Sequence, residues 1–173
     1  MKKKIVTLKY LLKKKLKGPV GLCWGGFDLL HAGHIEHFMF AKKFVKTLIV
    51  GINSDKHFPN KGINRPIMNE KRRLRNLSLL NIVDFALVYK GKTLDQNEKS
   101  SYGYMHKKKV KTPYIPLDIL ENLKIDFYFK GFEYKNRLIP EIKFLKYNKI
   151  KIRYGPKKNI FSSSKILLDE SKK

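Results

Sequence analysis

Residues 20–34 read VGLCWGGFDLLHAGH. The first five residues of this stretch are a short, mostly apolar run, and the glycines at positions 25 and 26 interrupt it. Short apolar runs of this kind are typical of buried strands in parallel sheets. The residues from 32 to 44 then predict a helix. A buried strand, a glycine turn and a helix in this order indicate the first half of a β-α-β unit.

The rest of the chain continues this alternation of strands and helices. We expect strands at residues 47–52, 83–89, 125–129 and 150–154, and helices at residues 69–80, 117–123, 140–147 and 162–168. A lysine-rich helix at residues 7–16 precedes them, with Thr7 as its cap and Gly18 beyond its end. The pattern predicts an α/β fold, a single Rossmann-like doubly wound domain whose five-stranded parallel sheet carries helices on both faces.

Composition narrows the class of protein. The chain has 173 residues, of which 42% are hydrophobic, so wholesale disorder is excluded. Its 39 basic and 14 acidic residues give a net charge of +25, which favours anionic partners. Most of the basic residues are lysines spread along the chain, so a solvated lysine surface is the simplest interpretation, ahead of attraction of a phosphorylated substrate or nucleic acid.

Other features set the expected compartment. The single cysteine, Cys23, excludes an internal disulfide framework and a cysteine-based metal site. No run reaches the roughly 18 apolar residues that a membrane span needs. The first residues lack the apolar stretch of a signal peptide. We therefore expect a cytoplasmic protein in a reducing setting.

The sharpest chemical feature is the pair His31 and His34, which flank Gly33 where the first strand meets the first helix. Ligands of parallel sheets bind at the carboxyl ends of the strands, near the point where the strand order reverses. The start of a helix attracts anions, and two imidazoles there can donate hydrogen bonds to phosphate oxygens as charge grows during phosphoryl transfer. Residues 51–55 and 130–134 should also lie at the carboxyl ends of the strands, on the same side of the sheet as the histidines.

Residues 26–34 resemble the signature loop of the HxGH nucleotidyltransferase superfamily, especially its cytidylyltransferase-like branch. The strongest resemblance is to the heptose-phosphate adenylyltransferase domain of lipopolysaccharide-core synthesis, and the next is to glycerol-3-phosphate and choline-phosphate cytidylyltransferases. It continues through short matches along the chain: Ala41-Lys42, Asn53-Ser54-Asp55, Arg65-Pro66, Glu70-x-Arg72, Val83-Asp84, residues 130–134 and residues 162–166. It implies that residues 1–18 are a leading helix of one nucleotidyltransferase domain, which continues over residues 19–173.

The resemblance implies roles for particular residues. His31 and His34 would contact the triphosphate and stabilise the transition state, while Lys42 and Arg72 would bind phosphate. Arg73 is the alternative to its neighbour Arg72. The implied nucleotide-binding residues are Gly25, Gly26, Phe27, Asp28, Gly33, Lys130, Gly131, Glu133, Ser162, Ser163 and Ser164. Among these, Asp28 would shape the loop rather than act as a base.

The function implied is transfer of a nucleotidyl group from CTP or ATP to a phosphorylated sugar or polyol, with release of pyrophosphate. We expect Mg²⁺ to bridge the triphosphate oxygens, because it usually keeps waters and takes few protein ligands. The choice between CTP and ATP stays open, and so does homodimer formation.

Two alternatives also stay open. Lys157 and Ile160 replace an arginine and a glycine of the family pattern, so a nucleotide-binding module with altered catalysis is one. A nucleic-acid-binding protein is the other. The long segment at residues 90–113 has little periodicity, and we expect either a lid over the acceptor side of the site or a passive insertion.

Overall fold

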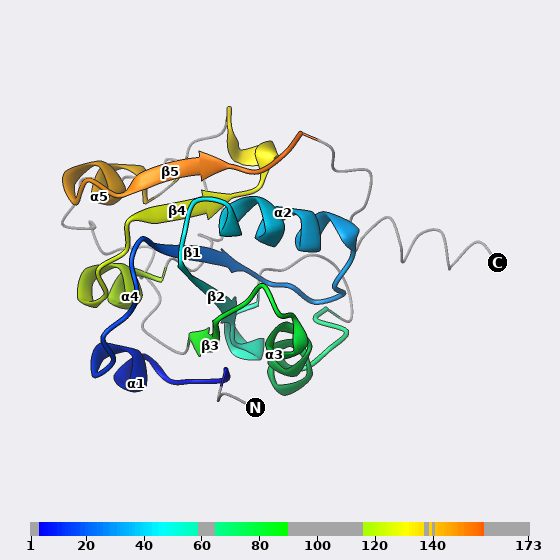
Figure 1. The fold of residues 1–173 in the computed structure, drawn as a ribbon. Coiled ribbons are helices and arrows are strands. Elements are labelled where there is room, and N and C mark those ends of the chain that lie inside the picture. Colours follow the sequence, from blue (N-terminus) through cyan, green and yellow to red (C-terminus); the bar gives the residue numbers. More distant parts are fainter. Residues whose placement is uncertain (1–3, 59–64, 90–115, 137–138, 140, 158–173) are drawn as a thin grey trace, which may run out of the picture.

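The computed structural model describes residues 4–58, 65–89, 116–136, 139 and 141–157. Five parallel strands form one sheet in the order β3-β2-β1-β4-β5, as expected from the sequence (Figure 1). The strands are β1 (Val20–Gly25), β2 (Thr47–Asn53), β3 (Phe85–Tyr89), β4 (Phe127–Lys130) and β5 (Lys151–Tyr154). The helices are α1 (Leu8–Leu12), α2 (Ala32–Lys42), α3 (Glu70–Leu79), α4 (Leu117–Asn122) and α5 (Ile142–Tyr147). The helix expected at 162–168 and the segment at 90–113 lie outside the described residues.

Helices cover both faces of the sheet, because successive strand side chains point to opposite faces. On one face, Phe38 of α2 and Leu77 of α3 pack on alternate side chains of the strands. On the other face, Leu11 of α1, Ile119 of α4 and Leu145 of α5 cover the remaining side chains. Every residue of β2 is buried, which accounts for its continuous apolar sequence.

Local signals set where the helices begin and end. The Thr7 hydroxyl accepts a hydrogen bond from the Tyr10 N–H at 3.2 Å, so Thr7 caps α1 as predicted. The helix ends at Leu12, earlier than expected, where three lysines follow that offer the core no apolar side chain. Asn69 caps α3 through its side-chain oxygen, which accepts from the Arg72 N–H at 3.0 Å. None of the described helices is long and apolar enough to cross a bilayer.

The sheet has its switch point between β1 and β4. From β1 the chain moves outward through β2 to β3, and it then returns to place β4 on the other side of β1. The arrowheads of β1, β4 and β5 point to the same side of the molecule in Figure 1. The carboxyl ends of β1 and β4, at Gly25 and Lys130, therefore flank the place where ligands of such sheets bind.

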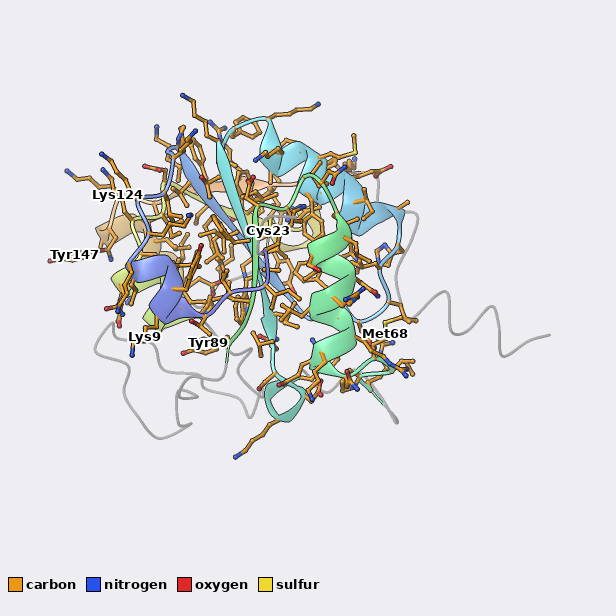
Figure 2. The ribbon with its side chains drawn as sticks, turned by 60° about the horizontal axis from the view of Figure 1, so that its bottom comes forward. Lys9, Cys23, Met68, Tyr89, Lys124 and Tyr147 are labelled. Carbon is orange, nitrogen blue, oxygen red and sulfur yellow. The ribbon has the colours of Figure 1, made fainter. Side chains whose placement is uncertain are left out.

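Cys23 lies in the middle of β1, deep inside the molecule (Figure 2). Burial raises the pKa of its thiol well above the ordinary value, so the side chain stays a neutral thiol. A buried neutral thiol is a packing residue, which fits its place in the apolar layer under α2.

Candidate active site at the switch point

The site is built around the first turn of α2. His31 is the residue before the helix, and its backbone carbonyl accepts from the His34 N–H at 2.9 Å. Its side chain makes no capping hydrogen bond to the helix. The first amide groups of a helix have no acceptor within it, and they form the positive end of the helix dipole. This turn therefore offers N–H donors and a favourable potential to an anion.

The two motif histidines lie together. The rings of His31 and His34 are stacked, with centroids 3.8 Å apart and planes inclined by 22°. Phe27 packs its ring against His34 at 5.1 Å and against Phe38 at 5.0 Å. The backbone of Phe27 has φ 45, in the left-handed region that non-glycine residues rarely adopt. A loop residue held there by packing is typical of a functional turn.

Asp28 fastens this loop to the segment before α3. Its buried carboxylate accepts hydrogen bonds from the N–H groups of Ile67 at 2.9 Å and Met68 at 2.8 Å. It also lies 2.7 Å from the Nε of Arg65. These contacts occupy the carboxylate, so Asp28 shapes the loop.

Arg73 connects several segments at the carboxyl ends of the strands. Its fully buried guanidinium donates to the backbone carbonyls of Gly26 at 2.7 Å, Asn53 at 2.8 Å and Met68 at 3.0 Å. A further bond goes to the Asp55 carboxylate at 2.7 Å. One side chain thus joins the signature loop, the end of β2 and the start of α3.

Neighbouring Arg72 has a different position. Its side chain is exposed on α3, where a charged group can reach a ligand or solvent. The sequence left the role open between the two arginines, and the described contacts make Arg73 the structural one. The spacing of buried residues on α3, at positions 73, 74 and 77, is the helical signal that identifies Arg73 as inward-facing.

Lys42 does not lie with the histidines. It is at the far end of α2, about 12 Å along the helix from His34 at 1.5 Å per residue. There it forms an ion pair with Asp84, which precedes β3, and donates to the Lys46 carbonyl at 2.9 Å. The structure thus corrects the prediction that Lys42 lies with the histidines around the phosphates. A helix of this length carries its last residue to the opposite end of the sheet, where the strands begin.

The turn after β4 flanks the switch point on the side opposite the turn after β1. Lys130 ends the strand, and the carboxylate of Glu133 folds back over Gly131, where a β-carbon would come within 2.5 Å of it. A side chain at position 131 would displace this exposed, flexible carboxylate. The predicted residues Ser162, Ser163 and Ser164 lie outside the described residues.

A comparison with known protein families matches residues 22–167 to the cytidylyltransferase-like family. The chain belongs to that family. Its sequence is 30% identical to the bifunctional protein HldE of Campylobacter fetus over 146 residues, which are 83% of this chain and 27% of that protein. Against HldE of Helicobacter pylori it is 32% identical over 144 residues, 83% of this chain and 26% of that protein. The chain thus spans about a quarter of the length of these curated relatives.

A solved structure has a fold similar to that of this chain. The lipopolysaccharide core biosynthesis protein of Thermoplasma volcanium superposes with a TM-score of 0.54 and 22% identity, covering 81% of this chain and 98% of that one. At this identity the likeness concerns the fold.

The described residues of the site include no ready-made cluster of metal ligands. Within the described ranges, no three His, Cys, Asp or Glu side chains come together as ligands. The carboxylates of Asp28 and Asp55 are engaged by arginine and backbone N–H groups. Mg²⁺ is commonly bound through substrate phosphates with few protein ligands.

Proposed function

We propose that this chain is a nucleotidyltransferase, which transfers NMP from CTP or ATP to the phosphate of a sugar or polyol and releases pyrophosphate. One observation carries the proposal. The stacked pair His31 and His34 lies at the amino end of α2, beside the switch point of a parallel sheet. Membership of the cytidylyltransferase-like family supports the same reaction class.

The chemistry asks for positioning more than for a base. A phosphate oxygen of the acceptor is already an anion, so it can attack the α-phosphate in line without losing a proton. The work left to the protein is to hold the two phosphates together and to stabilise the charge that develops. His31, His34 and the first amides of α2 would donate to the triphosphate oxygens.

Other groups would complete the phosphate site. The exposed Arg72 would supply a formal charge from α3. The hydroxyls of Ser162, Ser163 and Ser164 would add donors from the C-terminal segment, as the family resemblance implies. Mg²⁺ on the triphosphate would supply charge neutralisation when bound.

The test is pyrophosphate release, measured with each of four NTPs against a panel of sugar and polyol phosphates. We expect release with CTP or ATP that depends on one phosphorylated acceptor. Tight NTP binding without pyrophosphate release from any pair would favour the alternative of a nucleotide-binding module. Retention on DNA with no NTP binding would overturn the proposal in favour of nucleic-acid binding.

A further inference from the structure

A cavity of about 610 Å³ lies at the amino ends of the strands, on the side of the sheet away from the candidate active site. Residues of α1, of the segment that follows it and of the turn between α4 and β4 line the cavity, and α1 lies beside α4 there (Figure 1). Val20, which begins β1, is part of the lining, whereas Gly25 ends that strand at the switch point. At about 3.3 Å per residue, the strand separates the two by about 16 Å, so the cavity is separate from the nucleotide site.

The walls of the cavity are mainly aliphatic. Leu11 and Leu123 belong to the buried core, while Leu12, which also lines the cavity, is 48% exposed. Protein interiors are normally close-packed, so a hollow of this size deprives the apolar side chains around it of contact atoms. The volume falls within the range of pockets that bind small ligands, roughly 300–1,000 Å³. The described lining contains no aromatic ring on which a nucleobase could stack.

The charged groups around the cavity favour an anion. Lys14 and Lys124 line it and are exposed, and among the described residues neither ammonium forms an ion pair with a carboxylate. Lys14 instead lies 5.6 Å from the ring centre of Tyr10, which adds no formal negative charge. The acidic residue of the lining is Asp126, and one of its oxygens accepts from the Val20 N–H at 2.7 Å. Positive charge therefore exceeds negative charge around an apolar space.

We propose that this cavity binds a small carboxylic acid with an aliphatic chain. The chain would fill the space between Leu11, Leu16 and Leu123, where burial of its apolar surface favours binding. The carboxylate would accept charge-assisted hydrogen bonds from Lys14 and Lys124, which distinguish it from a neutral molecule of the same length. The bound acid would join α1 to the turn before β4. This site is additional to the proposed nucleotidyl transfer and does not depend on it.

Calorimetry of the full chain with octanoate tests the proposal. In parallel titrations, 1-octanol supplies the chain without the charge, and acetate supplies the charge without the chain. We expect saturable binding of one octanoate per chain, with 1-octanol at least about tenfold weaker, the usual size for losing a hydrogen bond to a charged group. Acetate should not bind measurably. Saturating CTP or ATP should change octanoate affinity by less than about twofold, because the two sites do not overlap.

A variant that fills the cavity locates the bound chain. Position 18 is exposed, and a β-carbon on Gly18 would lie at an ordinary contact distance of 3.9 Å from the Oδ2 of Asp126, so a side chain fits there. Gly18→Phe should weaken octanoate and 1-octanol alike, by about tenfold or more. If this variant does not fold, Leu12→Glu at the exposed position replaces it, and its carboxylate should weaken octanoate by a similar factor.

A pair of lysine variants tests the charge. Lys14→Met combined with Lys124→Met should weaken octanoate by about tenfold or more and leave 1-octanol within about twofold. The matched control combines Lys143→Met with Lys151→Met, which removes the same charge from exposed positions outside the cavity. The control should bind octanoate within about twofold of the wild type.

Several results would overturn the inference. Absence of saturable octanoate binding up to about 10 mM would mean that the cavity takes no such acid. Equal losses in the two double lysine variants would mean unspecific attraction by the net charge of +25. Equal affinities for octanoate and 1-octanol would remove the preference for an anion. Unchanged octanoate affinity in a folded Gly18→Phe would place the ligand outside the cavity.

Two other occupants are tested with the same cavity-filling variant. Binding to phosphatidylglycerol vesicles that Gly18→Phe abolishes, with no binding of octanoate, would replace the small acid by a membrane surface. A dimer in light scattering that Gly18→Phe dissociates, again with no binding of octanoate, would replace it by a second copy of the chain. Either result would reject the proposed ligand.

Discussion

Replacing Arg73 with methionine should loosen the whole candidate site. The substitution keeps an unbranched side chain of similar length and removes every donor of the guanidinium. The carbonyls of Gly26, Asn53 and Met68 would each lose a hydrogen bond, and Asp55 would lose its ion pair. The segments that these groups belong to would then be joined by fewer contacts.

The loss of unfolding free energy depends on whether water can replace the hydrogen bonds that Arg73 made. A buried carbonyl left without a donor costs about 1–3 kcal/mol. The Asp55 side chain is 40% exposed, so water can replace its lost partner and its share is small. Partial rehydration at the rim lowers the sum, and we expect Arg73→Met to reduce the free energy of unfolding by about 3–5 kcal/mol.

Urea unfolding followed by circular dichroism measures this change. With a slope of about 2 kcal/mol per molar urea, the midpoint should fall by about 1.5–2.5 M. Arg72→Met is the matched control, because its exposed side chain should alter stability by no more than about 0.5 kcal/mol while weakening NTP binding. An unchanged midpoint and slope for Arg73→Met would refute the reasoning, since the described network would then contribute nothing.

Three further substitutions test other parts of the structure. His34→Ala should lower turnover by orders of magnitude in steady-state kinetics while the circular dichroism spectrum stays that of the wild type; near-normal turnover would remove it from the site. Lys42→Ala should lower the thermal midpoint without raising the KM for NTP, because its partner Asp84 lies at the opposite edge; a raised KM would return Lys42 to phosphate binding. Burial lowers the pKa of His37 to about 4. As the pH falls from 6.5 to 4, the unfolded chain therefore takes up a proton that the folded chain does not bind, and the free energy of unfolding decreases. His37→Phe should remove a stability loss of up to about 3 kcal/mol over that interval, and parallel stability curves would contradict this.

The central strands were predictable because they are buried on both faces of the sheet, whereas β5 at the edge alternates between exposed and partly buried residues. The runs at 20–24 and 47–52 are almost continuously apolar, and residues 150–154 alternate between apolar and basic side chains. Their strands lie within one or two residues of the expected positions. Helix ends were less predictable. The three lysines after Leu12 are compatible with a helix, so their residue types alone do not place the end of α1 there. The end depends on what the helix can bury against α4 and the sheet, to which these lysines add no apolar side chain.

The direction of individual side chains was harder to predict than the elements that carry them. The sequence identifies a helix at residues 69–80, but which of Arg72 and Arg73 faces inward depends on the rotation of that helix against the sheet. Lys42 was misplaced for a related reason, because its place in a motif says nothing of the length of helix that separates it from His34. The buried Glu141 carried no signal, since a lone glutamate before a helix is ordinarily a surface residue.

The pairing of charges around the rim explains why a net charge of +25 does not by itself locate a phosphate site. Arg65, Arg73 and Lys130 lie at or near the candidate site, and each is 12% exposed or less and paired with a carboxylate. A cation neutralised in this way fixes backbone or aims a donor, and it adds little long-range attraction. Under the proposed function, the attraction for a triphosphate would come from the amide end of α2 and from exposed cations such as Arg72, beside which the described residues place no carboxylate. Exposed charges are screened by salt while the amides of α2 act at contact distance, so nucleotide affinity should fall with ionic strength mainly through Arg72. A steep salt dependence that survives in Arg72→Met would place the attracting charge elsewhere on the chain.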